Sequence, residues 1–285
     1  MEKILITGSS GMLGSYVARS IDRTRYEVFC PSSAELNLKD PEAIAKAIKE
    51  INPNIILHLA AETNVDLCEV DVRHAAKINC KATEVLSKAA SQVGAWVVYI
   101  STSNVFGARK KLAYNELDLP DPENYYGRSK LAGEKAIEKY CSQNCLIIRA
   151  SWMIGGGLAK DQKFVGKIVG QIKAGASVLR AVDDKYGTVT LASSLAAFII
   201  RSIPERKIGT YHFASQGLVT RFDIAKAVAK YLNFQGQVLA AKSSEFPLSA
   251  PRPDSEGIVS VYLDKEDGIG LFEDDIKKYI SEEFV

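Results

Sequence analysis

Short runs of branched apolar residues recur along the first half of the chain, and stretches with helical spacing of apolar positions separate them. Each run is apolar at nearly every position, which is typical of strands that a parallel sheet buries on both faces. The predicted strands are residues 3–7, 26–30, 53–61, 96–100 and 145–149. The predicted helices between them are residues 15–21, 41–50, 72–93 and 126–140. This alternation predicts an α/β fold in which right-handed crossovers build a doubly wound parallel sheet.

Three glycines follow the first predicted strand at once, and a helix is predicted to continue directly behind them. Gly8 permits a tight turn, Gly11 lets the backbone approach a ligand, and Gly14 lets the helix pack close to the strand. The N-terminus of that helix, at Met12 and Leu13, would face the pyrophosphate of a dinucleotide. A strand before these glycines and a helix after them predict a Rossmann domain that binds NAD(P), rather than a plain glycine turn.

The second half of the chain has a less regular pattern, with no repeat, low-complexity tract or obvious linker. It predicts helices over residues 164–174, 191–203 and 221–232 and one strand over 178–182. We therefore assign residues 1–150, with parts of 188–235, to the NAD(P)-binding domain. Residues 151–187 and 236–285 are assigned to a smaller, mainly C-terminal α/β lobe that binds the substrate.

The end of the second predicted strand bears on the choice of cofactor. Enzymes that bind NAD usually place an acid there to hold the ribose 2′-hydroxyl. This chain reads Pro31-Ser32-Ser33 instead, with neither Asp nor Arg. Two hydroxyl groups can hydrogen-bond a 2′-phosphate, so Ser32 and Ser33 favour NADP(H) slightly over NAD(H).

Tyr126 and Lys130 are the candidates for proton chemistry. They are four residues apart, so a helix places both side chains on one face, whereas Tyr125 points elsewhere. A phenol ionises near pH ~10, and an ammonium beside it is expected to lower the pKa of the phenol toward neutral pH. The alternative is that Tyr126 and Lys130 are an ordinary solvated tyrosine and lysine, which would have the same spacing. Thr102 adds weight to the chemical interpretation, because it follows the strand 96–100 at the sheet edge where ligands bind.

Composition and charge exclude several classes of partner. The 285 residues carry a net charge of +2 from 36 basic and 34 acidic side chains that are mixed along the chain. No basic run indicates a nucleic-acid or membrane surface. No apolar run nears the ~20 residues that span a bilayer, and the first strand begins too early to leave room for a signal peptide.

Cysteine and histidine usage gives no metal site. The five cysteines contain no Cys-x-x-Cys pair, which favours reduced thiols in a cytoplasmic protein. The three histidines are scattered without metal-ligand spacing. Cytoplasmic location and the absence of a metal are therefore expected.

With a glycine loop, a Ser-Thr after a strand and Tyr-x-x-x-Lys in this order, the chain resembles the extended short-chain dehydrogenases/reductases. Within that family it is most similar to the dTDP-4-dehydrorhamnose reductases, from about residue 3 to about residue 255. The stretches that carry the resemblance are residues 60–66, 100–106, 126–134, 149–152, 182–190 and 252–253.

The resemblance implies NAD(P)H-dependent reduction of the 4-keto group of a nucleotide-activated deoxysugar, from dTDP-4-dehydrorhamnose to dTDP-rhamnose, by a possible homodimer. It makes Thr102, Tyr126 and Lys130 the catalytic set, with Trp152 at the sugar and Arg252 near the nucleotide. It also assigns residues to the cofactor: Gly8, Gly11 and Gly14 at the pyrophosphate, Asn37 and Leu38 near the adenine, Ala60 and Ala61 along the cofactor, Thr63 close by, and Lys130 at the nicotinamide ribose.

The chain departs from the family pattern at positions that are expected to contact the sugar and the nucleotide of the substrate. Ser103 and Asn104 stand in place of an acid and an aromatic residue, and Lys163-Phe164 stands in place of an Asn-Phe pair. These departures leave open another nucleotide-sugar reductase or epimerase, or a non-catalytic NADP-binding regulatory subunit. Dehydratases of the family usually carry acidic residues next to the threonine, and their absence here argues against dehydration.

Three of these residues have ordinary structural interpretations as well. Asn79 would either route protons through a water or face solvent from its helix. Trp152 would otherwise be a core aromatic residue, and Arg252 a solvated loop arginine between two prolines.

Overall fold

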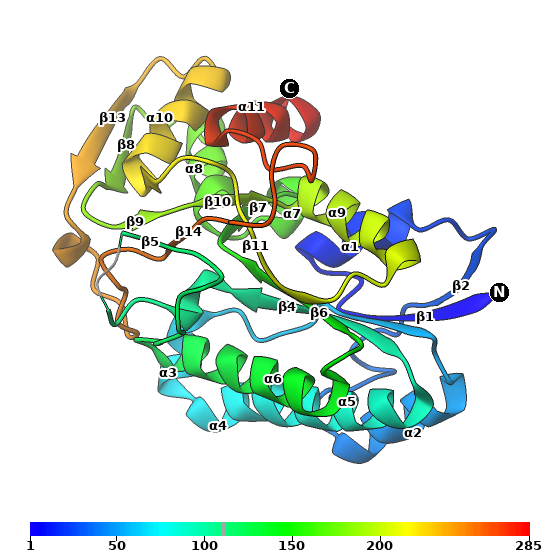
Figure 1. Cartoon of the computed structure of the whole chain (residues 1–285). Coiled ribbons are helices and arrows are strands. Elements are labelled where there is room, and N and C mark those ends of the chain that lie inside the picture. Colours follow the sequence, from blue (N-terminus) through cyan, green and yellow to red (C-terminus); the bar gives the residue numbers. More distant parts are fainter. Residues whose placement is uncertain (110–111) are drawn as a thin grey trace.

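The computed structural model describes residues 1–109 and 112–285, and at the centre of this part lies a sheet of six parallel strands (Figure 1). In chain order they are β1 (Glu2–Thr7), β2 (Tyr26–Phe29), β3 (Ile55–His58), β4 (Trp96–Thr102), β6 (Cys145–Ala150) and β11 (Gly209–Phe213). Their order across the sheet is β11-β6-β4-β3-β1-β2, and every neighbouring pair is parallel. The predicted doubly wound α/β fold is confirmed.

Alternating side chains along the strands divide the core into two layers. On β1, Ile4 and Ile6 face one side of the sheet and Leu5 faces the other, and all three are fully buried. Helices cover both sides (Figure 1), with α1 (Met12–Ser20) and α9 (Ala192–Glu205) on the first and α2 (Pro41–Ile51), α5 (Ala82–Val93) and α6 (Tyr125–Cys141) on the second. Burial on both faces explains why these strands read as unbroken apolar runs.

The helix predicted over residues 72–93 is not a single α-helix. Its ends are α4 (Val72–Ala75) and α5, and between them Ala76–Lys81 (η1) forms a π-helical segment. Such π segments are rare and frequently occur at functional sites. A short helix that the pattern did not predict, α3 (Val65–Val70), precedes α4.

The second half of the chain packs around a core of its own, which includes Val165, Ile168, Leu179, Val228 and Ile276. Its helices are α7 (Gly157–Lys160), α8 (Phe164–Lys173), α10 (Arg221–Tyr231) and α11 (Phe272–Glu283). Short strands pair around it: β7 (Trp152–Ile154) with β10 (Val189–Leu191), β8 (Val178–Val182) with β13 (Gln237–Ala241), β9 (Tyr186–Gly187) with β12 (Val219–Thr220), and β5 (Ala113–Tyr114) with β14 (Gly257–Ile258). Two 3-10 turns are η2 (Ser103–Val105) and η3 (Ser243–Glu245).

Several of these elements differ from the predicted pattern. The pattern did not predict β11, β13 or α11, and β11 brings the chain back to the main sheet beside β6. The strand predicted over residues 53–61 ends earlier, at His58, so the residues after it form a loop. Within residues 1–109 and 112–285, no helix combines the length and apolarity needed to cross a membrane.

A buried ion pair fastens α6 to β6. Arg149 donates from Nε to Glu134 Oε1 at 3.0 Å and from Nη2 to Glu134 Oε2 at 2.7 Å. The two side chains are only 6% and 2% exposed. Since both charges are desolvated, loss of one partner leaves the other without compensation.

We expect Glu134→Ala to lower the free energy of unfolding by about 3–5 kcal/mol, because it strands the buried Arg149 charge. Chemical denaturation measures the change. The matched control is Glu84→Ala, which removes an exposed ion pair with Lys81 on a neighbouring helix and should cost less than about 1 kcal/mol. Equal losses in the two variants would contradict the role given to the buried pair.

Candidate active site

The strand order reverses between β1 and β3, and the loops that follow these two strands lie very close together. In an open α/β sheet, ligands bind outside the carboxyl ends of the strands at such a point. Gly8 follows β1 with φ of +73°, a conformation that favours glycine, and a Cβ there would lie 2.8 Å from Ala60 Cα. A Cβ on Gly14 would lie 2.0 Å from the Gly8 carbonyl oxygen. Side chains at these two positions are therefore excluded by the backbone itself.

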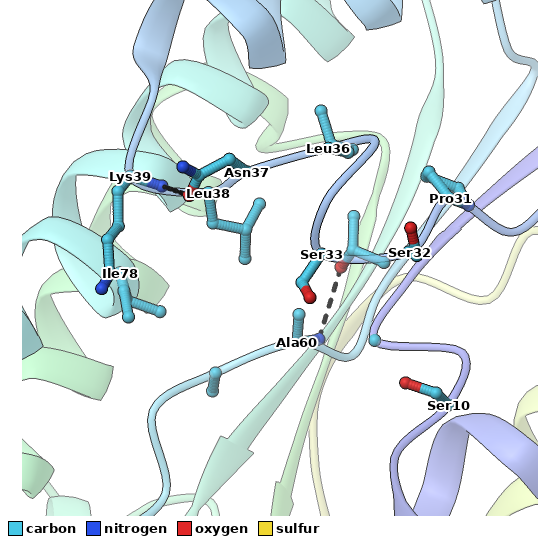
Figure 2. Close-up of a pocket in the computed structure, with 13 residues that line it drawn as sticks. Ser10, Pro31, Ser32, Ser33, Leu36, Asn37, Leu38, Lys39, Ala60 and Ile78 are labelled. Carbon is cyan, nitrogen blue, oxygen red and sulfur yellow. Dashed lines mark hydrogen bonds between the residues drawn. The ribbon is translucent and has the colours of Figure 1, made fainter.

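A first cavity of about 370 Å³ lies between the loop after β2 and the loop after β3 (Figure 2). The predicted cofactor residues Ser32, Asn37, Leu38, Ala60 and Ala61 all line it. The structure thus brings together two segments that the sequence assigned separately to one ligand.

Lys39 also lines the first cavity and was not predicted. Figure 2 shows it at the far end of the loop that carries Ser32 and Ser33, with its backbone N–H donating to Asn37 Oδ1 at 3.0 Å. The Ser32 hydroxyl accepts a hydrogen bond from the Glu35 N–H at 3.3 Å. This loop therefore offers hydroxyl groups and one cation to the cavity.

A second cavity of about 390 Å³ adjoins the first and shares the Gly8 and Ala60 walls. Its lining contains many of the residues predicted for cofactor or chemistry: Gly8, Gly11, Met12, Leu13, Gly14, Ala60, Ala61, Thr63, Thr102, Tyr126 and Lys130. Two hydroxyls in this wall, Ser101 Oγ and Ser151 Oγ, are buried without a hydrogen-bond partner among the described residues. Because buried polar atoms are rarely left unpaired, these two groups indicate a ligand that would pair with them.

The first turn of α6 is seated directly on η2, the turn after β4. Asn124 caps the helix by accepting from the Gly127 N–H at 2.9 Å. A Cβ on Gly127 would lie 1.9 Å from the Asn104 carbonyl oxygen, so no side chain fits there. This seat brings Tyr126 to the end of β4, where Tyr126 and Thr102 line the same two cavities.

The structure corrects the expected pKa of Tyr126. Burial raises the pKa of this phenol above its ordinary value, and the nearby carboxylates of Glu256 and Glu62 raise it further. The nearby Thr102 side chain only partly opposes these effects. The prediction that Lys130 lowers this pKa toward neutral is therefore wrong, because desolvation dominates. The phenol keeps its proton at neutral pH.

Lys130 is itself deeply buried, with 2% of its surface exposed. Its ammonium lies 4.1 Å from the centroid of the Tyr99 ring. Burial lowers the pKa of Lys130 to about 7, and the neighbouring Glu134 carboxylate opposes the change. The amine therefore gains and loses its proton near neutral pH.

Asn79 does not face solvent, so that interpretation is wrong. It is 1% exposed in the π-helical segment, and its Oδ1 accepts from the Glu62 N–H at 2.9 Å. Its Nδ2 donates to the Glu62 carbonyl at 3.1 Å and to Ser129 Oγ at 3.0 Å. Asn79 thus ties the loop after β3 to α6. A part in proton transfer stays a prediction.

A third cavity, of about 500 Å³, continues from the second past Thr102 and Tyr126. A fourth, of about 550 Å³, continues from the third. The residues predicted to read the substrate all line the third cavity, and two of them line the fourth as well: Ser103, Asn104, Trp152 and Arg252. The four cavities therefore form one continuous path across the carboxyl edge of the sheet.

The sequence left open whether Trp152 and Arg252 contact the substrate or have only ordinary structural roles. Trp152 belongs to the second core, and yet its indole Nε1 is buried without a hydrogen-bond partner among the described residues. Arg252 is not simply solvated, because its Nη2 lies 2.9 Å from Asp66 Oδ2. Both side chains remain part of the cavity walls.

The sequence matches the family described as the RmlD substrate binding domain over residues 1–283. The chain belongs to this family. A dTDP-4-dehydrorhamnose reductase from Escherichia coli (strain K12) is 32% identical over 265 residues, which cover 88% of this chain and 87% of the relative. The crystal structure of a dTDP-4-dehydrorhamnose reductase from Yersinia enterocolitica is 52% identical, with a TM-score of 0.95 and 99% of each chain covered. A further dTDP-4-dehydrorhamnose reductase, from Bacillus anthracis in complex with NADP, is 29% identical with a TM-score of 0.91 over 99% of each chain.

This member of the family has two cations in its third and fourth cavities: Lys163, which the sequence marked as a departure from the family pattern, and Arg221, which it did not mark. The guanidinium of Arg221 lies 3.7 Å from the centroid of the Trp152 ring. Burial lowers the pKa of Arg221 to about 10. Burial also lowers the pKa of Lys163, and repulsion from the Arg221 charge lowers it further. Neither cation forms an ion pair with another residue in the described part of the chain. Each lies at the start of a helix, and Arg221 is in no motif that could have marked it.

The corner beside Ser103 and Asn104 holds a carboxylate from a distant part of the chain. Glu256 lines the third and fourth cavities and accepts a hydrogen bond from Ser103 Oγ at 3.3 Å. The residues after Thr102 are still Ser and Asn, and Glu256 is an acid near them that the sequence did not predict. No local signal could have found Glu256, since its partner is 153 residues away in sequence.

The buried Lys130 predicts a pH-dependent difference in stability. The unfolded chain keeps a proton on lysine up to pH ~10.4, whereas the folded protein releases it near pH 7. Between these values the unfolded state holds more protons, so the parent gains about 1.4 kcal/mol of stability per pH unit relative to a variant without the amine. We expect Lys130→Met to be more stable than the parent at about pH 7 and below, and this advantage to shrink toward pH ~10.

Urea denaturation of the parent and of Lys130→Met across this pH range measures the difference. Lys135→Met, at an exposed position of the same helix, controls for the loss of a lysine from α6. A parent-to-variant difference that does not change with pH would show that Lys130 keeps an ordinary pKa in the folded protein.

Proposed function

We propose that the protein reduces the 4-keto group of dTDP-4-dehydrorhamnose to give dTDP-rhamnose, with NADPH as the preferred reductant. The observation that carries this proposal is the position of Thr102 and Tyr126, which both line the second and the third cavity where the two meet. One cavity is lined by the glycine loop and the other by the predicted substrate residues. The names of the relatives over nearly the whole chain support the same reaction.

The residues of the first two cavities fit a dinucleotide. Gly8 and Gly14 would let the backbone approach a pyrophosphate at the N-terminus of α1. The unpaired Ser101 and Ser151 hydroxyls would gain partners from the bound ligand. When bound, the reduced nicotinamide supplies the hydride. Thr63 and Lys130 line the same cavity, and Lys130 would hydrogen-bond the nicotinamide ribose.

Ser32, Ser33 and Lys39 would hold the 2′-phosphate that distinguishes NADPH from NADH. They lie on one loop at the wall of the first cavity (Figure 2). A lysine ammonium is a strong donor to a phosphate oxygen. The complex of a 29% identical relative with NADP is consistent with this preference.

Tyr126 and Thr102 would act on the carbonyl oxygen of the substrate. As negative charge develops on that oxygen, Tyr126 donates its phenolic proton to it, and Thr102 hydrogen-bonds the same atom and holds the carbonyl in place. The raised pKa of Tyr126 suits the reductive direction, because the donor must hold a proton when the reaction starts. Lys130 would then favour the return of a proton to Tyr126 through its own titration near pH 7.

The third and fourth cavities would hold the nucleotide sugar. Lys163 and Arg221 are two buried, mutually repelling cations, and an anion between them would compensate both charges. We assign them to the diphosphate of the substrate. Trp152 would contact the sugar, and Arg252 would lie near the nucleotide.

On this proposal, residues 1–150 with α9 and β11 hold the cofactor, and residues 151–187 and 236–285 supply most of the substrate contacts. We also propose a cytoplasmic location and assembly as a homodimer. The five cysteines, all free in the described part of the chain, are consistent with a reducing compartment.

We expect Tyr126→Phe to lower the turnover of dTDP-4-dehydrorhamnose by roughly 10²–10⁴, because it removes the proton donor. NADPH binding, measured by fluorescence titration, should stay close to that of the parent. Tyr125→Phe is the matched control, since it removes the neighbouring phenol, which does not line the cavities described above. Unchanged turnover in Tyr126→Phe would exclude the assignment, and a parent that binds NADPH without consuming it would indicate a regulatory subunit.

We expect Lys39→Ala to raise the KM for NADPH by about tenfold to a hundredfold, because one charge-assisted hydrogen bond is lost. The KM for NADH should change little, since NADH has no 2′-phosphate. Steady-state assays with both cofactors measure the ratio. Lys46→Ala serves as the control, because Lys46 is an exposed residue of α2 outside the cavity. Equal effects on the two cofactors would place Lys39 away from the 2′-phosphate.

A further inference from the structure

Glu256 is held rigidly at the wall of the third and fourth cavities. Its backbone N–H donates to the Tyr186 carbonyl at 3.0 Å, and Ser255 before it forms a β-bridge with Tyr186. Gly257 after it begins β14, which pairs with β5. Pairing on both sides fixes the direction of the Glu256 side chain, which is 8% exposed and lines both cavities.

One oxygen of this carboxylate is fully engaged by the turn after β4. Ser103 Oγ donates to Glu256 Oε2 at 3.3 Å, and Asn104 Nδ2 donates to the same oxygen. The Asn104 amide cannot flip freely, because its Oδ1 accepts from Asn124 Nδ2 at 2.9 Å. Asn124 in turn caps α6, the helix that carries Tyr126. A chain of amides therefore links the position of the carboxylate to the position of the phenol.

The other oxygen, Glu256 Oε1, makes no hydrogen bond to any residue in the described part of the chain. Lys163 and Arg221 respond to the Glu256 charge, but neither forms an ion pair with it among the described residues. Oε1 is not one of the fully buried polar atoms, so it is open to the cavity, where a donor from the ligand can reach it. A ketone oxygen cannot donate, whereas the ring hydroxyls of a sugar can.

We propose that Glu256 supplies the carboxylate of the substrate cavity in place of an acid at position 103, and that its free oxygen accepts a hydrogen bond from a ring hydroxyl of the keto sugar. This inference rests on the proposed function. It makes Glu256 a specificity residue for sugars with a free hydroxyl near the carbonyl. The hydrogen bond from Ser103 shows that a side chain at position 103 reaches the same corner.

The first experiment pairs the protein with substrate analogues. The parent and Glu256→Ser are assayed with NADPH and dTDP-4-dehydrorhamnose, and with two analogues that each lack one ring hydroxyl. We expect the parent to lose about tenfold to a hundredfold in kcat/KM on one analogue, because the buried carboxylate is left unpaired. Glu256→Ser should lose a similar factor on the full substrate and discriminate little between the substrate and that analogue. Equal discrimination by parent and variant on both analogues overturns the inference.

The second experiment moves the carboxylate from position 256 to position 103, on the other side of the Ser103–Glu256 hydrogen bond. We expect Ser103→Asp alone to lower kcat/KM, because two carboxylates then meet in one buried corner. The double variant Ser103→Asp with Glu256→Ser should recover to within about tenfold of the parent, since one carboxylate again occupies that corner. A double variant no more active than Glu256→Ser, with NADPH affinity equal to that of the parent, overturns the inference.

Controls separate this inference from a folding defect and from the proposed function. Glu256→Gln keeps the shape and one acceptor oxygen, so it should bind NADPH normally and lose activity mainly through the KM for the sugar. Glu266→Gln removes an exposed carboxylate outside the cavities and should match the parent. A parent that does not reduce dTDP-4-dehydrorhamnose overturns the proposed function and this inference with it. An active parent with an equally active Glu256→Ser overturns this inference alone.

Discussion

The chemistry of this protein depends on how closely the first turn of α6 approaches the turn after β4. That approach is possible only because position 127 has no side chain, since a Cβ there would lie 1.9 Å from the Asn104 carbonyl oxygen. Asn124 and Gly127 close the end of the helix, and the helix then delivers Tyr126 to Thr102. Further along α6, the buried pair of Glu134 and Arg149 fixes the helix to β6. The proton donor is therefore positioned by a backbone contact between α6 and η2, a cap at the start of α6 and a buried charge pair between α6 and β6.

Burial of the side chains around this contact explains their charge states. Desolvation is the first cause of the shifts at Tyr126, Lys130, Lys163 and Arg221, and in each case it disfavours the charged form. The phenol therefore keeps its proton, and the buried cations Lys163 and Arg221 have no ion-pair partner among the described residues. A site of this kind is incomplete by itself, because buried cations are costly without an anion. On the proposed function, a phosphorylated cofactor and a diphosphate-linked sugar would supply the missing charges.

The sequence predicted those features that local chemistry determines. Strands buried on both faces read as apolar runs, and the glycine turn follows from backbone contacts that no other residue tolerates. The spacing of Tyr126 and Lys130 is a property of any helix, but their burial is not, so the direction predicted for the pKa of Tyr126 was wrong. The strand β11 was missed because Gly209–Phe213 is an edge strand that is only partly buried and carries no continuous apolar run. Residues such as Lys39 and Arg221 gain their meaning only from the cavities that the fold builds around them.

Glu256 shows most clearly why a motif read along the chain can mislead. The segment after Thr102 has lost its acid, which on the sequence alone suggests an altered or inactive site. In three dimensions, a carboxylate from before β14 reaches the same corner and is held there by Ser103 and Asn104, the residues that replaced the expected pair. The substitutions and the new carboxylate fit one another, because a hydroxyl and an amide are donors that an acid at position 103 would not provide. The departure from the family pattern is therefore accompanied by a carboxylate that comes from the segment before β14, and the Glu256 charge adds to the desolvation that keeps the phenol protonated.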